Sequence, residues 1–120
     1  RSGHHAHAKF GLRPTWGLSQ RLPRLVGFAR ARELSLTART FRGTEAAAMG
    51  MVARAVPGAE LDGAVDELLA QILANSPASL RAYKDLYGRA LDLGQTEALR
   101  YEADTEFEID DTAARLAEFR

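Results

Sequence analysis

The sequence contains no cysteine, so it can form neither a disulfide nor a thiolate nucleophile. It also has no run of about 18 apolar residues, the length that a helix needs to span a bilayer. Its first residues lack the charged, apolar and small segments of a secretory signal. Together these absences predict a protein of the cytoplasm that has no membrane partner.

The composition is that of one ordinary globular domain. Of the 120 residues, 46% are hydrophobic and 27% are charged, which is usual for a folded domain and excludes a disordered tail or a fibre. A chain of this length builds one hydrophobic core at most.

The formal net charge is zero, but its two signs are separated along the sequence. Residues 1–54 carry ten basic side chains against Glu33 and Glu45, whereas residues 55–120 carry fourteen acidic side chains against six basic ones. A basic half suits a phosphate-bearing ligand or nucleic acid, and opposite charges also let the two halves attract each other. Attraction between the two oppositely charged halves is the simpler interpretation. Because the sequence holds no motif that reads nucleic acid, we expect no nucleic-acid partner.

The first six residues have no apolar periodicity and read as the remnant of an affinity tag or a linker. His4, His5 and His7 have a spacing that suits a metal ion. No carboxylate or thiolate follows in the next twenty residues to complete a coordination shell. We therefore expect no metal site and leave residues 1–6 out of the fold.

The first half of the chain predicts short helices and one extended edge. Apolar residues at helical spacing predict helices over 18–26, ended by Gly27, and over 29–36. An extended segment over 37–43 follows, and Thr44 suits the N-cap of a helix over 45–49. The alternating residues 51–56 predict a short strand or an extended edge.

Beyond Pro57 the chain is predicted to be helical throughout. A first helix buries a stripe formed by Leu61, Val65, Leu68, Leu69, Ile72 and Leu73. Ser76 and Pro77 start the next helix, whose stripe is Leu80, Tyr83, Tyr87 and Leu91. Thr96 caps a third helix that carries Leu99, Ala103, Phe107 and Ile109, and residues 113–119 form the last. The fold class is therefore mainly α, with five or six helices and one short extended segment.

The stretch from Gly11 to Gly27 reads GLRPTWGLSQRLPRLVG. It resembles the pattern G-L-x-P-G-x-G-x-x-Q-R-L-x-R-x-x-G of the crotonase superfamily, the enoyl-CoA hydratases and isomerases. Later motifs follow in the same order: Ala31, Glu33-Leu34, Leu36-Thr37 and Arg39, then Glu45-Ala46, Gly50 to Val52, Val56-Pro57, Ser76-Pro77 with Lys84, Asp110-Asp111 and Phe119-Arg120. The likeness covers roughly His7 to Arg120, and such collinear matching is more specific than a single motif.

The resemblance implies that this chain is the C-terminal part of the α/β crotonase (ClpP/crotonase-like) fold. Residues 7–58 would end the core of that fold with a pocket loop, helices and a short strand. Residues 59–120 would be a helical trimerisation region, which implies a homo-oligomer, a trimer or hexamer. The substrate would be an acyl-CoA thioester, with coenzyme A as part of the substrate and no separate cofactor.

In such enzymes two backbone N–H groups bind the thioester carbonyl and stabilise an enolate-like transition state. The resemblance places both donors, and the first acid/base glutamate, upstream of the segment present here. Removal of one such donor lowers turnover by about 10²- to 10³-fold. We therefore expect this chain alone to be inactive.

The resemblance also implies the site residues. Counting back four residues from Gly11 puts His7 where hydratases of the family have a carboxylate, so His7 is either a base or merely pocket lining or linker. The acyl pocket would be lined by Leu12, Pro14, Thr15 and Trp16. Thr15 stands where the family pattern has a glycine. Trp16 could instead be part of the hydrophobic core.

The likeness at the C-terminus suggests that Phe119 contacts the adenine of CoA, although a core or interface phenylalanine fits the pattern equally well. Arg21 and Arg24 either meet the CoA phosphates or are solvated helix arginines. A non-catalytic helical fragment that oligomerises or binds CoA is the alternative function, because half of a domain leaves apolar faces exposed.

Overall fold

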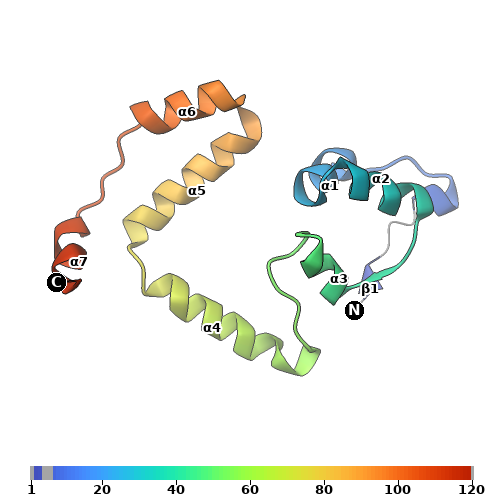
Figure 1. Cartoon of the computed structure of the whole chain (residues 1–120), viewed down its shortest axis with the longest axis horizontal. Coiled ribbons are helices and arrows are strands. Elements are labelled where there is room, and N and C mark those ends of the chain that lie inside the picture. Colours follow the sequence, from blue (N-terminus) through green and yellow to red (C-terminus); the bar gives the residue numbers. More distant parts are fainter. Residues whose placement is uncertain (1, 4–6, 120) are drawn as a thin grey trace. The chain divides into compact units, whose positions relative to one another are not determined.

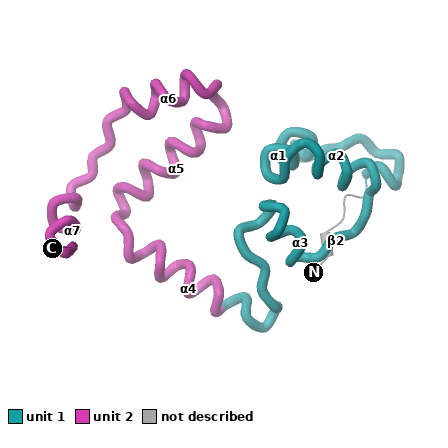
Figure 2. The backbone as a smooth tube through the Cα atoms, viewed as in Figure 1, with its two compact units in different colours: residues 1–62 teal, residues 63–120 magenta. Residues whose placement is uncertain are grey.

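The computed structural model describes residues 2–3 and 7–119. The chain divides into two compact units, residues 1–62 and residues 63–120 (Figure 2), and each is described by itself. No helix in the described part of the chain is both long and apolar enough to cross a bilayer.

The first unit is built from short elements (Figure 1). A 3-10 turn η1 (Ala8–Phe10) leads to the helices α1 (Leu18–Val26) and α2 (Phe28–Thr37), then to β2 (Phe41–Arg42), α3 (Gly43–Ala48) and a second 3-10 turn η2 (Gly58–Glu60). The strand β1 (Ser2–Gly3) pairs antiparallel with β2. Residues 1 and 4–6 of the segment read as a tag or linker lie outside the described residues, and that interpretation stays a prediction.

The helical hairpin of α1 and α2 turns at Gly27. Its φ of 84° belongs to the region that favours glycine. The N–H of Gly27 donates to the carbonyl of Pro23 at 2.9 Å, and its own carbonyl accepts from the N–H of Ala31 at 3.0 Å. One residue thereby ends α1 and begins α2. The predicted bounds of α1 are confirmed, including the glycine that ends it.

The core of the first unit is small. Leu34 is fully buried and packs with Phe41, Ala46 and Met49. Arg39 joins α2 to α3 beside this core, because its guanidinium donates to Glu33 at 2.6 Å and to Glu45 at 3.0 Å. The hydrogen bond from Arg39 lowers the pKa of Glu45, and the bonds to Glu33 and Glu45 raise the pKa of Arg39.

The predicted strand over 51–56 is wrong, since the structure has bends and irregular backbone there. Gly50 turns with a φ of 78°, and the N–H of Met51 folds back to the carbonyl of Ala46 at 2.9 Å. This backbone hydrogen bond ends α3. An alternating pattern of side chains does not form a strand unless a partner strand is present to pair with it. Thr44 is not the N-cap of α3 either, because the helix begins at Gly43 and its N-cap is Arg42.

The second unit contains α5 (Pro77–Asp92), α6 (Gln95–Asp104), α7 (Thr112–Glu118) and nearly all of α4 (Leu61–Leu73) (Figure 1). The predicted helix over the stripe from Leu61 to Leu73 and the cap at Ser76 are confirmed: the Ser76 hydroxyl accepts from the N–H of Ser79 at 3.2 Å. Thr96 is not a cap, because Gly94 holds that position. Phe107 and Ile109 lie in the connection after α6 and not in a helix.

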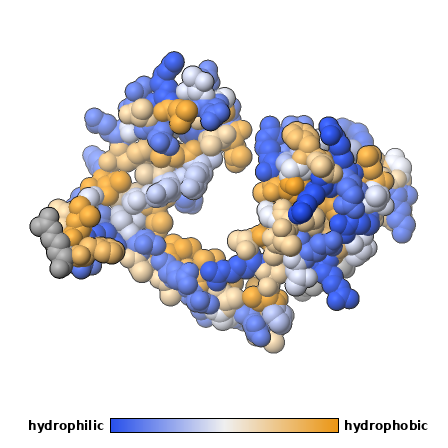
Figure 3. All heavy atoms as spheres, in the orientation of Figure 1, coloured by the Kyte–Doolittle hydropathy of each residue, from blue (hydrophilic) through white to orange (hydrophobic). Residues whose placement is uncertain are grey.

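The expectation that α4 buries its apolar stripe is wrong for this chain. Its six residues, Leu61, Val65, Leu68, Leu69, Ile72 and Leu73, all keep between 38% and 79% of their surface exposed. Tyr83, Tyr87 and Leu91 of α5 are exposed as well. Figure 3 shows apolar atoms along these helices. The mainly helical fold class is confirmed, although the described residues form seven α-helices where five or six were expected. The second unit has little core of its own.

A polar network holds α7 to the turn between α4 and α5. Asp111, the N-cap of α7, accepts from the Ser76 hydroxyl at 2.6 Å and from Nε of Arg115 at 2.5 Å. The guanidinium of Arg115 also donates to the carbonyl of Ala74 at 2.9 Å. The bond from Ser76, together with that from Arg115, lowers the pKa of Asp111.

Acid should therefore release α7. A carboxyl whose pKa is lowered by folding adds stability above its unfolded pKa, and that stability is lost as the pH falls through the folded pKa. We expect amide exchange in α7 to accelerate below about pH 4, relative to the pH trend of unstructured peptides, while α1 and α2 keep their protection. Asp111→Asn should accelerate exchange in α7 already at neutral pH, whereas Asp110→Asn should not. Equal protection of α7 in both variants would contradict the role of this network.

The burial of Leu34 makes a second prediction. Leu34→Ala should lower the free energy of unfolding by about 2–5 kcal/mol, because it opens a cavity in the only buried cluster of the described first unit. Leu36→Ala, at a side chain that is 80% exposed, should change it by no more than about 0.5 kcal/mol. Urea unfolding followed by circular dichroism measures both. Similar losses in the two variants would show that the core lies elsewhere.

Candidate functional site: an apolar pocket beside the loop of residues 7–17

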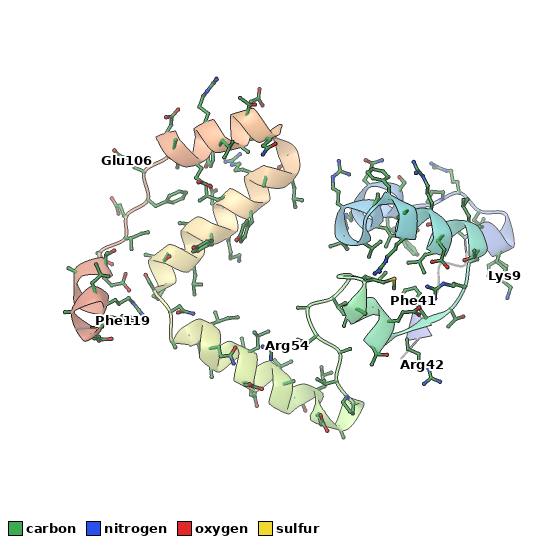
Figure 4. The ribbon with its side chains drawn as sticks, in the orientation of Figure 1. Lys9, Phe41, Arg42, Arg54, Glu106 and Phe119 are labelled. Carbon is green, nitrogen blue, oxygen red and sulfur yellow. The ribbon has the colours of Figure 1, made fainter. Side chains whose placement is uncertain are left out.

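The loop of residues 7–17 is held by its own backbone. The carbonyl of His7 accepts from the N–H of Phe10 at 3.2 Å and from that of Leu12 at 2.8 Å. Gly11, with a φ of 66°, makes the tight reversal between them. Two bonds to one carbonyl fix the backbone position of His7. Figure 4 shows Lys9, in the same turn, pointing away from the rest of the unit.

The end of the loop leads directly into α1. Trp16 has a φ of 56°, unusual for a residue with a side chain, and Gly17 follows with a φ of 74°. The carbonyl of Gly17 accepts from the N–H groups of Gln20 and Arg21, which starts the helix. The reversal leaves Trp16 on the surface with 86% of its area exposed, so Trp16 is not a core residue of this chain.

The loop and the helical hairpin line an open apolar cavity of about 270 Å³. It is lined by His7, Ala8, Leu12, Pro14, Leu18, Ser19, Ser35 and Leu36. The structure thus brings together three of the predicted site residues, His7, Leu12 and Pro14. The lining set contains one ionisable side chain, that of His7.

A second cavity of about 380 Å³ adjoins the first along the hairpin. The two share Leu18, Ser19, Ser35 and Leu36, and Phe28 and Arg32 are among the further residues that line the second. A groove lined in this way is apolar with few polar groups, which is usual for a site that takes an amphipathic small molecule.

Thr15 and Trp16 do not line the first cavity but both contact His7. The hydroxyl of Thr15 lies 3.3 Å from Nε2 of His7. The Trp16 ring meets the imidazole edge-on, with ring centroids 5.9 Å apart and planes at 75°. The imidazole is therefore held from two sides at the cavity.

The remaining predicted positions are not among the residues that line this cavity. Phe119 belongs to the second unit, where it follows α7 with 93% of its surface exposed (Figure 4). Arg24 donates to the carbonyl of Gln20 at 2.8 Å and to its side-chain oxygen at 3.2 Å. No group of three or more His, Asp or Glu side chains suited to a metal occurs in the described ranges.

Sequence reasoning missed the wall that α2 contributes. Ser35 and Leu36 line both cavities, and no motif marks them as site residues. Gly27 was the feature of the sequence that could have indicated this wall, because a chain reversal at Gly27 places the end of α2 opposite the start of α1. The ion pairs of Arg39 and the network around Asp111 were missed as well, although Arg39 and Asp111 themselves lie within the motifs of the resemblance.

Comparison with known proteins agrees with this architecture. The model of the enoyl-CoA hydratase/isomerase family matches residues 4–115. A peroxisomal Arabidopsis thaliana protein named enoyl-CoA hydratase 1 is 36% identical over 98 residues, 80% of this chain and 37% of the relative. A peroxisomal dienoyl-CoA isomerase of the same plant is 38% identical over 88 residues, 72% of this chain and 32% of the relative.

Among solved structures, a Thermobifida fusca protein described as an enoyl-CoA hydratase, in complex with CoA, is 40% identical. The match covers 98% of this chain and 44% of that one, with a TM-score of 0.74. The chain thus spans less than half the length of each of these relatives. With a family match over nearly all of its residues, the chain belongs to the enoyl-CoA hydratase/isomerase family of the crotonase superfamily.

Proposed function

We propose that this chain is the C-terminal part of an enzyme that acts on acyl-CoA thioesters, and that its first unit binds the acyl group. The observation that carries the proposal is the apolar cavity at the family's own motif, where Leu12 and Pro14 face Leu18 and Leu36. The names of the relatives support it, since they are hydratases and an isomerase of CoA thioesters and one was solved with CoA bound.

The chemistry follows from what the pocket offers and what it lacks. An apolar wall on one side of the acyl chain removes part of that chain from water. The described lining contains no carboxylate, so His7 is the group able to accept or return a proton there. We propose that the oxyanion-hole donors lie in a part of the enzyme outside these 120 residues, so the chain alone has only background activity.

Coenzyme A enters this scheme as part of the substrate, without a separate cofactor. We propose that Phe119 stacks on the adenine, since a phenylalanine with 93% of its surface exposed is available for such a contact. We also keep the cytoplasm as the proposed location, although two of the relatives carry peroxisomal names.

The second candidate function is assembly without catalysis. The exposed apolar stripes of α4 and α5 favour it, because isolated soluble proteins rarely expose contiguous apolar surface of this kind. We propose that these helices form the contacts of a trimer or hexamer. Both functions are compatible, since an acyl-CoA enzyme can also oligomerise through these faces.

The catalytic proposal predicts complementation. Joining this chain to the N-terminal part of the Thermobifida fusca relative should create a protein that binds acyl-CoA at micromolar concentration, measured by calorimetry, because both halves of the site are then present. The N-terminal part alone is the control and should bind at least about tenfold more weakly. A well-folded fusion that binds no acyl-CoA would count against the proposal, and so would enzymatic turnover by the isolated chain.

The assembly proposal predicts self-association that depends on α4. Leu69→Glu should weaken association by about tenfold or more in sedimentation velocity, because it puts an unpaired charge into an apolar contact. Gln71→Glu adds the same charge to the same helix at a polar, exposed position and serves as the control. A chain that sediments as a monomer at all concentrations and unfolds cooperatively would contradict this idea.

A further inference from the structure

The last helix of the second unit has no apolar anchor. α7 contains seven residues, none of which is buried, and the segment before it, residues 105–111, is not helical. A helix of this length is not stable in water by itself. The position of α7 therefore depends on contacts other than burial in a core.

Two hydrogen bonds between distant parts of the sequence supply these contacts. The Ser76 hydroxyl donates to Asp111 at 2.6 Å across 35 residues, and the guanidinium of Arg115 donates to the carbonyl of Ala74 at 2.9 Å across 41 residues. Nε of Arg115 also donates to the Asp111 carboxylate, so both bonds belong to one network. Because the bonds start from the N-cap of α7 and from one turn further along, they fix both the place of α7 and its rotation about its own axis.

Phe119 follows α7 on the same face as this network (Figure 4). Asp111, Arg115 and Phe119 are spaced four residues apart, and residues at this spacing are neighbours on a helix surface. The N–H of Phe119 donates to the carbonyl of Leu116 at 3.3 Å, so the last turn of the helix leads directly into Phe119. With 93% of its surface exposed, the Phe119 side chain is hardly held by the rest of the chain. Its place is therefore set by α7, and the place of α7 is set by the network.

An exposed aromatic ring binds a flat partner more tightly when its place is fixed beforehand. A ring on a mobile arm loses conformational freedom when the ligand binds, and this loss lowers affinity. Stacking on a nucleobase uses the face of the ring and needs no hydrogen bond from it, so its strength depends on where the ring stands. A network that orders α7 can thus raise affinity without touching the ligand.

We infer that Asp111, with its partners Ser76 and Arg115, is a positioning residue for the nucleotide end of CoA: the network orders α7 and so holds the Phe119 ring where it stacks on the adenine. This inference rests on the proposed adenine contact of Phe119 and names the residues that prepare the ring for it. The acyl cavity of the first unit is lined by other residues, so the network acts on the nucleotide half of the substrate alone.

The test uses the 120-residue chain and the two halves of the substrate as separate ligands. Adenosine 3′,5′-bisphosphate represents the nucleotide end of CoA, and butanoyl-pantetheine carries the acyl chain without a nucleotide. Ligand-observed NMR measures the affinity of each. Asp111→Asn should weaken binding of the bisphosphate by about three- to tenfold and leave binding of butanoyl-pantetheine unchanged.

The sign of the effect separates positioning from charge. Removal of a carboxylate by itself favours an anionic ligand, so a loss of affinity in Asp111→Asn runs against the change in charge. Asp110→Asn makes the same change at the neighbouring residue and should bind the bisphosphate as tightly as the unaltered chain or slightly more tightly. Ser76→Ala removes the donor to Asp111 without any change in charge and should weaken binding in the same direction as Asp111→Asn.

A double-mutant cycle shows whether the network acts through the ring. Phe119→Leu keeps an apolar side chain and removes the stacking surface, so it should weaken binding of the bisphosphate by about tenfold. Asp111→Asn added to Phe119→Leu should then cause no further loss, because no ring remains to be positioned.

Three outcomes overturn the inference. Equal binding of the bisphosphate by the unaltered chain and by Asp111→Asn, with Phe119→Leu weaker than both, rejects the positioning role but leaves the proposed adenine contact standing. A loss in Asp111→Asn that persists in full beside Phe119→Leu shows that the network acts through other residues. No difference between the unaltered chain and Phe119→Leu rejects the adenine contact, and the positioning role with it.

Discussion

The reversal of the chain at Gly27 is the constraint on which the rest of the first unit depends. A φ of 84° lets one residue end α1 and start α2 without a loop between them, so the two helices return against each other. The start of α1 then faces the end of α2, which places Leu18 and Ser19 opposite Ser35 and Leu36. The loop of residues 7–17 closes one side of that space, and the acyl site proposed here is the result.

The second unit is held together by a different kind of interaction. Polar contacts connect its helices: Tyr101 donates to Asp85 at 2.6 Å, Arg89 lies 5.1 Å from the centre of the Tyr101 ring, and Asp111 joins α7 to the turn at Ser76. Apolar side chains on α4 and α5 remain outside these contacts. Such helices are positioned by polar contacts while their apolar faces stay available for other surfaces, which agrees with the role in assembly that we propose.

Sequence reasoning reached the helices whose signals are local. The spacing of leucines and the glycine after Val26 were sufficient for α1, and the Ser76-Pro77 pair was sufficient for the start of α5, because each boundary is decided by a cap or a left-handed residue. The prediction of a strand over 51–56 was wrong for the opposite reason. Whether an alternating segment forms a strand depends on a partner strand, and the local return from Met51 to Ala46 took its place.

The site was predicted only in part for the same physical reason. The motif around Gly11 and Pro14 marks the loop, but the contact between His7 and Thr15 depends on how that loop closes, and the wall at Ser35 and Leu36 depends on the packing of two helices. Neither is a property of residues that are neighbours in sequence. The exposure of the apolar stripe of α4 likewise depends on whether another protein surface packs against it. The periodicity of α4 shows only that the stripe exists.

The central claim is that the space between the loop and the helical hairpin receives the acyl chain. Intermolecular NOEs in the enzyme assembled with a complementing N-terminal part test it most directly, between the methyl groups of Leu18 and Leu36 and the protons of a bound acyl-CoA. The account predicts NOEs from both leucines to the acyl chain and none to the pantetheine methyl groups. NOEs from the acyl chain to other residues, with Leu18 and Leu36 silent, would contradict it.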